Sequence, residues 1–428
     1  MAMTLTKGFP ELIHPVAPQA FTADYWEQRP LVLQRDDPAY YDDLLTLADL
    51  DGILASMSVP ETSIRLASQG TTTWLPDLAQ SQDGWATEAV YREYRRGATI
   101  NIVHLHEHWP ALARLCQALT SEFTATVQTN IYLTPRRSQG LTPHYDNHDV
   151  FVAQIHGTKH WRLYDSPVRL PLAEQRPGPA ADHGPPVREF DMKPGDLLYL
   201  PRGTVHDATS NDEASLHLTI GVAPLTWAGY LQIVLRDAAA RDIRLREGIP
   251  RHPQRLHETV AGLLAGIGGQ VDAGALLNDA HHALAGGAAE LSGHLLDLEA
   301  APALDLDTPL SPRAGLADRL SVTDGTACLE FQRKQIRMPA RVADELRFVT
   351  TRAEFTGRQI PGPLDEPGRL VLLRTLLTEG ALTRAAAPAP VTPRGSGAAP
   401  PRANGSTPAP EPARAGAPAR ATDDAGAG

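Results

Sequence analysis

Three residues at two places in the chain have the types and spacing needed to bind one metal ion. His144 and Asp146, in LTPHYDNHDVFVAQI, are two residues apart, so on a β-strand both side chains would project from the same face. About sixty residues later, GDLLYLPRGTVH places His206 just after a turn formed around Pro201 and Gly203. Two imidazoles and one carboxylate are a typical ligand set for a divalent transition metal. The sequence therefore predicts a metal site made of His144, Asp146 and His206.

The ligand set also indicates which chemistry the metal would support. Two histidines and one carboxylate on one triangular face leave three coordination positions open, enough for a bidentate co-substrate and oxygen. Because a carboxylate replaces thiolate and open positions are needed, iron(II) is favoured over zinc, while manganese and nickel stay open. The three predicted ligands are therefore also the candidate catalytic residues.

Other histidines compete for a role. His148 lies four residues after His144 and on a strand would face the same way, so it is a candidate pocket residue. His217 alternates with leucines in SLHLTI and is expected to face the interior without binding metal. The alternating histidines of HLHEHWP, residues 104–110, have no second cluster to support them, and we interpret them as surface residues or as packing at a helix start.

The elements that would position these residues are β-strands. Over about residues 98–225, short alternating runs such as TVQTNIYLTP, VFVAQI, KHWRLYD and SLHLTIGV are separated by Gly, Pro, Asn and Asp. This pattern is typical of a many-stranded sandwich or barrel, which would hold the ligands on a rigid wall. Residues 1–97 mix helical and strand patterns, and we assign no chemistry to them.

After residue 225 the pattern changes from strand to helix. Residues 226–310 are rich in Ala, Leu and spaced charges, which predicts amphipathic helices. Residues 311–385 contain two helical periods separated by the helix-breaking segment IPGPLDEPG, which indicates a small helical or winged-helix-like unit. From residue 386 the chain is mostly Ala, Pro, Gly and Arg, and residues 386–428 are predicted to be disordered.

Composition narrows the function classes. A chain of 428 residues with 42% apolar side chains can bury a large core and form several domains. The formal charge of -11 argues against nucleic-acid binding by phosphate neutralisation and suits a basic partner. Cys116 and Cys328 have no CxxC pairing, so neither a zinc ribbon nor a disulfide framework is supported. Without a leader pattern or a long apolar run, we expect a cytoplasmic protein that is not associated with a membrane.

The site segments resemble those of the JmjC-type ribosomal oxygenases. The likeness lies in NIYLTPRRSQGLTPHYDNHDVFVAQIHGTKHWRLYD, PGDLLYLPRGTVHDA and SLHLTIGV, and it extends over about residues 10–385. It implies an α+β fold with a double-stranded β-helix, the cupin/JmjC jelly roll, over residues 1–225. A helical dimerisation domain would follow at 226–310, and a small winged-helix-like domain at 311–385.

The resemblance also implies an activity. It suggests an iron(II)-dependent dioxygenase that uses 2-oxoglutarate and O2 as co-substrates and hydroxylates the β-carbon of an Arg or His residue in a ribosomal protein. The family's metal ligands fall on His144, Asp146 and His206. A homodimer is the expected assembly, with a ribosomal protein as substrate.

Four further residues match family positions that line the co-substrate and substrate pocket. Lys159, in HGTKHW, matches the lysine that pairs with the distal carboxylate of 2-oxoglutarate, and its ammonium group could offer one charge to a dianion. Tyr132 and Asn130, in TNIYLTP, and Thr219, on the closing strand, match the other three positions.

Several alternatives stay open. Arg162 and Arg202 are the nearest other cations that could hold the carboxylate. The same triad serves many substrates on one fold, so a small metabolite or a peptide natural product could replace the ribosomal protein. An alternative of another class is a non-catalytic cupin/winged-helix regulatory protein, against which the acidic charge and the intact triad both count.

Overall fold

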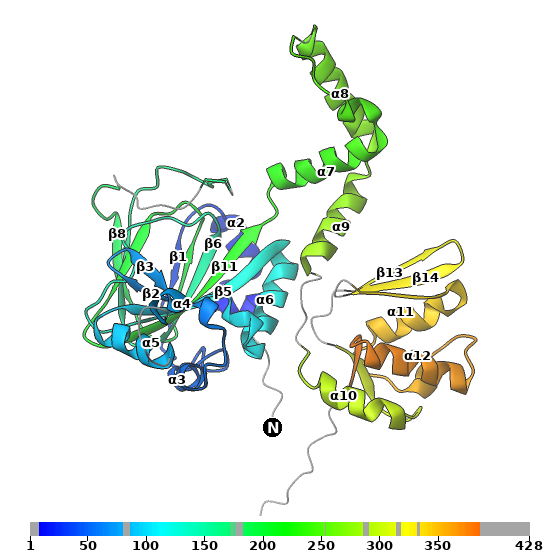
Figure 1. The fold of residues 1–428 in the computed structure, drawn as a ribbon, viewed down its shortest axis with the longest axis horizontal. Coiled ribbons are helices and arrows are strands. Elements are labelled where there is room, and N and C mark those ends of the chain that lie inside the picture. Colours follow the sequence, from blue (N-terminus) through cyan, green and yellow to red (C-terminus); the bar gives the residue numbers. More distant parts are fainter. Residues whose placement is uncertain are drawn as a thin grey trace, which may run out of the picture. The chain divides into compact units, whose positions relative to one another are not determined.

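The computed structural model describes residues 8–79, 86–172, 174–175, 183–252, 254–285, 291–313, 318–331 and 334–385. The segment predicted to be disordered, residues 386–428, lies outside the described residues. The described strands gather into four antiparallel sheets, two of which build the N-terminal domain (Figure 1).

A large antiparallel sheet forms one wall of the N-terminal domain. Its eight strands are, in spatial order, β1 (Leu31–Leu33), β9 (Leu197–Leu200), β6 (Asp149–His156), β11 (Ser215–Pro224), β5 (Ala125–Thr134), β4 (Thr99–Ile102), β2 (Ile64–Ser68) and β3 (Thr71–Trp74). The central strands β6 and β11 are buried over nearly their whole length. The predicted cupin-like arrangement of antiparallel strands is confirmed.

A smaller antiparallel sheet packs opposite the large sheet. It consists of β10 (His206–Ser210), β7 (Lys159–Leu163) and β8 (Arg188–Met192), in that order. The tight turn from β6 to β7 requires glycine, because Gly157 has a φ of +63° and a Cβ there would lie 1.9 Å from the Ala214 carbonyl oxygen. A hydrophobic cluster joins the two sheets, and Trp161, Leu163 and Met192 are its members from the small sheet.

Helices and aromatic side chains cover the outer face of the large sheet. The helices are α1 (Phe9–Ile13), α2 (Pro18–Asp24), α3 (Leu47–Ser56), α4 (Leu75–Ala79), α5 (Ala86–Arg95) and α6 (Pro110–Phe123), with 3-10 turns at Glu61–Ser63 and Leu105–Glu107. Aromatic rings from α1, α2 and α6 meet rings of β6 and β9, as in the edge-on contact of Phe21 with Tyr199 at 4.8 Å between centroids. These contacts join the first hundred residues to the strands that carry the predicted site.

The segment after β11 is helical, as predicted. Its helices are α7 (Trp227–Arg241), α8 (Leu256–Gln270), α9 (Ala273–Ala285) and α10 (His294–Ala300), with 3-10 turns at Ile243–Arg246 and Ala301–Ala303. Large apolar side chains on α7 and α8 are exposed, including Trp227 at 80% and Leu264 at 64%. Within the described ranges, no single helix is long and apolar enough to cross a membrane; α8 and α9, bent by 79°, reach that length and composition only as a pair.

The C-terminal segment has a hydrophobic core of its own. It contains β12 (Leu310–Pro312), β13 (Asp318–Thr323), β14 (Thr326–Phe331), β15 (Lys334–Pro339), α11 (Ala343–Thr351), α12 (Glu366–Thr378) and β16 (Leu382–Arg384), with 3-10 turns at Ala340–Val342 and Gly357–Gln359. β12 pairs with β16, and β13, β14 and β15 form a three-stranded sheet. Ala301 and Leu304 pack into this core, so the core extends across the boundary predicted at residue 311.

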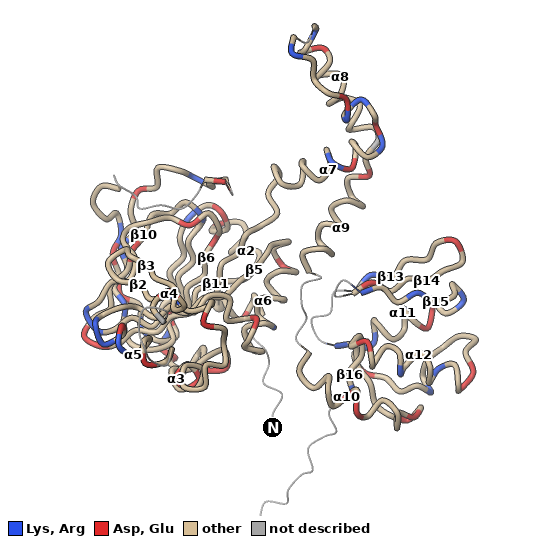
Figure 2. The backbone as a smooth tube through the Cα atoms, in the orientation of Figure 1, with Lys and Arg blue, Asp and Glu red and all other residues tan. Residues whose placement is uncertain are grey.

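Basic and acidic residues both occur along the described elements (Figure 2). In the C-terminal segment, for example, α11 carries Asp344 and Glu345 beside Arg347.

Candidate metal centre

His144, Asp146 and His206 meet in space, as the sequence predicted. One ligand atom from each residue lies within 4.8 Å of those of the other two, and His206 Nε2 is 3.8 Å from Asp146 Oδ2. Within the described part of the chain, these three residues form the one cluster of three or more His, Cys, Asp or Glu side chains that could hold a metal ion.

The pair His144 and Asp146 was expected on a strand, and this detail is wrong. β5 ends at Thr134, and both residues lie in the connection that precedes β6. His144 forms an isolated antiparallel bridge with His206, whose N–H donates to His144 O at 2.8 Å and whose carbonyl accepts from His144 N–H at 3.1 Å.

The Pro-Gly turn before His206 also holds the loop that carries Asp146. Gly203 has a φ of +88°, and a Cβ there would lie 2.2 Å from the Val168 carbonyl oxygen, so glycine is needed. The Gly203 N–H donates to Asp146 O at 2.8 Å. The two motifs, about sixty residues apart in sequence, are thus joined through their backbones.

Both ligand imidazoles are oriented by their own backbone. His144 Nδ1 lies 2.8 Å from Thr142 O, and His206 Nδ1 lies 2.9 Å from Thr204 O. A carbonyl oxygen only accepts, so each Nδ1 carries the proton and each Nε2 presents its lone pair to the shared space. This is the tautomer that a metal bound through Nε2 requires.

The protonation states also suit a metal. Burial, together with the neighbouring His144, lowers the pKa of His206 to about 4, so its ring is neutral at physiological pH. Burial opposes ionisation of Asp146, but His148, His144 and His206 together hold its pKa below the usual range. Neutral imidazole and ionised carboxylate are the metal-binding forms, so the donor set fits the predicted divalent ion.

A cavity of about 460 Å³ opens beside the triad, between the two sheets. The pairing of β5 with β11 places Tyr132 opposite His217 and Asn130 opposite Thr219, and all four side chains line the cavity. The rings of Tyr132 and His217 stack at 5.0 Å between centroids. Burial raises the pKa of Tyr132 to about 12, so its hydroxyl stays protonated and can donate a hydrogen bond.

Lys159 reaches this cavity from the first position of β7 and is 95% buried. Its ammonium donates to Thr134 Oγ1 at 3.0 Å and lies 3.4 Å from His217 Nδ1, with no carboxylate partner among the described residues. Burial lowers the pKa of Lys159 to about 7. A buried cation without an anionic partner is costly, and a bound anion would relieve that cost.

The two arginines that were alternatives to Lys159 as the carboxylate-binding cation have carboxylate partners of their own. Arg162 donates two hydrogen bonds to Asp207, each at 2.8 Å, and Arg202 pairs with Asp149 at 2.8 Å and also with Glu27. Neither arginine lines the cavity. The alternative that one of them faces the cavity in place of Lys159 is therefore wrong for this structure.

Of the remaining histidines, His148 lines the cavity, as expected for a pocket residue, and His217 faces the interior outside the triad. The histidines of HLHEHWP surround a 3-10 turn, where His106 Nδ1 accepts from the Thr129 N–H at 3.2 Å. They do not join a metal cluster within the described residues.

Sequence reasoning missed several residues that line the cavity. Arg65 comes from β2, within the region to which no chemistry was assigned, while Gln128 and Trp161 come from strands already recognised and Asp207 directly follows the predicted ligand His206. Gln128 is two residues before Asn130, so the alternation of β5 could have identified it. Nothing local in the sequence marks Arg65, because its position depends on β2 pairing with β4.

Comparison with known proteins confirms the resemblance. The JmjC domain family matches residues 102–230, which include all three predicted ligands. Ribosomal oxygenase 2 of Bos taurus is 36% identical over 269 residues, covering 59% of this chain and 56% of that protein. The bifunctional lysine-specific demethylase and histidyl-hydroxylase NO66 of Drosophila erecta is 35% identical over 254 residues, covering 56% of this chain and 38% of that protein. The chain thus spans little more than half the length of the first of these relatives and less of the second.

The fold is also similar to that of a solved ribosomal oxygenase. YcfD from Escherichia coli, in complex with cobalt and 2-oxoglutarate, aligns with a TM-score of 0.52 over 86% of this chain and 98% of its own. The sequence identity is 16%, so this likeness supports the fold.

Proposed function

We propose that this protein is an iron(II)- and 2-oxoglutarate-dependent dioxygenase that hydroxylates the β-carbon of a His or Arg side chain in a ribosomal protein. One observation carries the proposal: a His-Asp-His cluster and a buried lysine without a carboxylate partner line the same cavity. Metal coordination and recognition of a distal carboxylate are the two contacts that hold 2-oxoglutarate. The names of the relatives, ribosomal oxygenase and histidyl-hydroxylase, support the substrate class.

Each side chain has a definite task in this reaction. Iron(II) bound by the triad would supply the oxidising chemistry, in which 2-oxoglutarate and O2 become succinate and carbon dioxide while one oxygen atom enters a substrate C–H bond. Lys159 binds the distal carboxylate, and the Tyr132 hydroxyl and Asn130 amide supply further polar contacts. The apolar side chains of Val150, Val152 and Trp161 line the same cavity and reduce access of water to the reacting groups.

The charges around the cavity favour histidine over arginine as the target. Of the carboxylates that line it, Asp146 belongs to the triad, and Asp207 is occupied by Arg162. Arg65 adds a positive charge, since its guanidinium bonds Asn101 and lies over the Trp74 ring without an acidic partner in the described residues. A substrate guanidinium would meet a cation and no free carboxylate, whereas a neutral imidazole avoids both costs.

The test is hydroxylation of purified ribosomal proteins. The protein, iron(II), 2-oxoglutarate and air are incubated with a ribosomal protein mixture, and tryptic peptides are searched by mass spectrometry for the gain of one oxygen. The proposal expects the gain at a histidine or arginine, and the His144→Ala variant as control should give none. Hydroxylation of a small metabolite or peptide instead would replace the substrate assignment, and absence of succinate release with any of these substrates would overturn the enzyme assignment.

We also propose that the helical segment 226–310 forms a homodimer interface, to which α7 contributes an apolar stripe. Trp227, Leu231 and Leu235 follow each other at four-residue intervals on α7 and are 80%, 59% and 48% exposed. This spacing aligns them in one apolar stripe, which a second copy of the chain would remove from water. The cytoplasmic location and the winged-helix-like character of residues 311–385 stay predictions.

A further inference from the structure

Asp207 follows the ligand His206 directly but serves the opposite face of β10. Successive side chains of a strand point to opposite sides, so the Asp207 side chain leaves β10 on the side opposite to His206, although Asp207 still borders the cavity. Asp207 is nevertheless only 3% exposed. A buried carboxylate next to a metal ligand is costly unless it is fully hydrogen-bonded.

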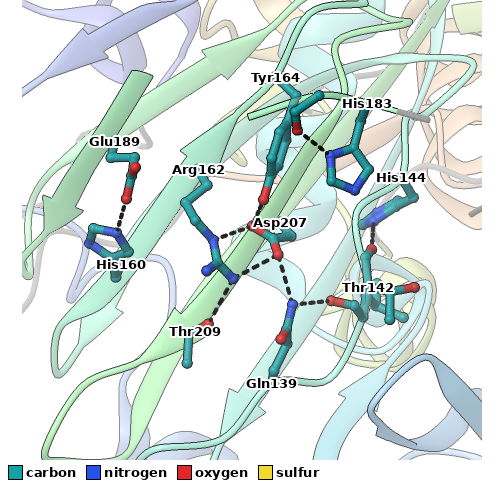
Figure 3. A network of polar contacts seen from close by, with 12 residues as sticks. Gln139, Thr142, His144, His160, Arg162, Tyr164, His183, Glu189, Asp207 and Thr209 are labelled. Carbon is teal, nitrogen blue, oxygen red and sulfur yellow. Dashed lines mark hydrogen bonds and ion pairs between the residues drawn. The ribbon is translucent and has the colours of Figure 1, made fainter. Parts of the chain in front are cut away.

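Asp207 is in fact held by three side chains, which together we call the Asp207 network (Figure 3). Arg162 Nε and Nη2 donate to its two carboxylate oxygens, each at 2.8 Å. The Tyr164 hydroxyl donates to Oδ1 at 3.2 Å, and the Gln139 amide Nε2 donates to Oδ2 at 2.8 Å. Arg162 and Tyr164 fix the carboxylate on the small sheet, while Gln139 comes from the loop that carries His144.

Gln139 extends the network to the metal ligand. Its Nε2 also donates to Leu141 O at 3.1 Å, and the next carbonyl, that of Thr142, accepts from His144 Nδ1 at 2.8 Å. Figure 3 shows Gln139 between Asp207 and the part of the loop that holds Thr142 and His144. The orientation of the His144 ring thus depends on a carbonyl whose neighbour is bound by Gln139.

Backbone hydrogen bonds join this loop to β10 on either side of the segment from Gln139 to Thr142, but not within it. On one side, the Ser210 N–H donates to Ser138 O at 3.1 Å. On the other side, the backbones of His144 and His206 exchange two hydrogen bonds. Between these anchors, the side chain that links the loop to β10 in the described residues is Gln139. An ion pair with one buried partner is weak evidence for stability, but its two hydrogen bonds fix the direction of the Asp207 carboxylate.

We propose that the Asp207 network is a positioning device for the metal centre. Asp207, fixed by Arg162 and Tyr164, acts through Gln139 to set the loop carbonyls that orient His144 toward His206 and Asp146. The inference rests on the proposed function for its catalytic consequence, whereas its effect on metal affinity is independent of any substrate.

Gln139→Ala is the first test, because Gln139 is only half-buried and its truncation leaves the buried Asp207–Arg162 pair intact. Cobalt(II) affinity of the metal-free protein is measured by visible absorption, without 2-oxoglutarate, alongside the melting temperature. Loss of such an outer contact weakens metal binding by roughly 10- to 100-fold in other sites, and we expect this range with little change in melting temperature of the metal-free protein. Arg137→Ala is the matched control, since it removes an exposed ion pair of the same loop with Asp212.

Asp207→Asn is the second test, because it keeps the shape but removes the charge that orders both Arg162 and Gln139. We expect weaker cobalt(II) binding than in Gln139→Ala, and a higher ratio of succinate formed to peptide hydroxylated. If Gln139→Ala and Arg137→Ala both bind cobalt(II) as the unaltered protein does, the inference is overturned. If the unaltered protein binds cobalt(II) but hydroxylates nothing, the proposed function fails while the positioning role stands.

Discussion

Replacing Lys159 by methionine should weaken 2-oxoglutarate binding more than it affects metal binding. Methionine nearly preserves the side-chain volume, so the cavity wall stays filled while the ammonium group is lost. Lys159 does not belong to the triad, and its ammonium contacts Thr134 and His217. The metal site should therefore remain intact, and the affinity for 2-oxoglutarate alone should change.

The size of the effect follows from the environment of the ammonium. A hydrogen bond to a charged group contributes roughly 1.5–3 kcal/mol, which corresponds to about 10-fold to over 100-fold in the dissociation constant. Because burial lowers the pKa of Lys159 to about 7, about half of the free protein carries the charge at pH 7. Protonating the neutral half on binding weakens the affinity for 2-oxoglutarate by only about a factor of two. The expected effect of the substitution on the dissociation constant is therefore little reduced.

The assay is an anaerobic titration of the iron(II)-loaded protein with 2-oxoglutarate, followed by the weak visible charge-transfer band of the chelate. Lys193→Met is the matched control, because the Lys193 ammonium pairs with the exposed Asp36 at 2.7 Å. The reasoning is refuted if Lys159→Met and Lys193→Met titrate alike. Arg65, the other lysine or arginine that lines the cavity, would then be the carboxylate partner to test.

Further outcomes follow from the same structure. The affinity for 2-oxoglutarate should fall as pH rises above about 7, by up to about tenfold per unit, because the deprotonated Lys159 must then take up a proton on binding; a flat profile from about pH 6 to 9 would contradict this. Asp146→Asn should abolish the visible band of the iron(II) and 2-oxoglutarate complex, and retention of both band and turnover would exclude Asp146 as a ligand. Light scattering should show a dimer that Leu231→Glu converts to a monomer, and a monomeric unaltered protein at micromolar concentration would remove the interface. Gly203→Ala should lower the melting temperature by several degrees, since its Cβ meets backbone at positive φ, while Gly248→Ala, in open space, should not.

The metal ligands could be found from sequence because their signal is local. His144 and Asp146 lie in one short motif, and Pro201, Gly203 and His206 form a second, so each set is placed by a few backbone angles. The alternating strands of residues 98–225 were equally visible, since alternation survives whenever one face of a strand is buried. For the metal ligands, the structure departs from the prediction in placing the first motif in a bridge before β6.

The residues that could not be predicted depend on contacts far apart in sequence. Arg65 reaches the cavity because β2 joins the large sheet beside β4, and the partnership of Gln139 with Asp207 joins positions 68 residues apart. Lys159 is intermediate, because a lone lysine is usually exposed, and it was identified only through the family resemblance. Its burial follows from the turn at Gly157, which begins β7 with the lysine facing the cavity.

The register between β7 and β10 gives the pocket its geometry. His206 pairs with Leu163 and Ser210 pairs with Lys159, so one antiparallel ladder carries the second histidine ligand near one end and the buried lysine at the other. A slip of one residue would turn the side chains of one strand to the opposite face, and either the metal or the carboxylate contact would be lost. Arg162 and Asp207 are directly opposed in the same ladder and joined by two hydrogen bonds, so they oppose that slip. The Arg162–Asp207 ion pair therefore stabilises the register on which both the metal contact and the carboxylate contact depend.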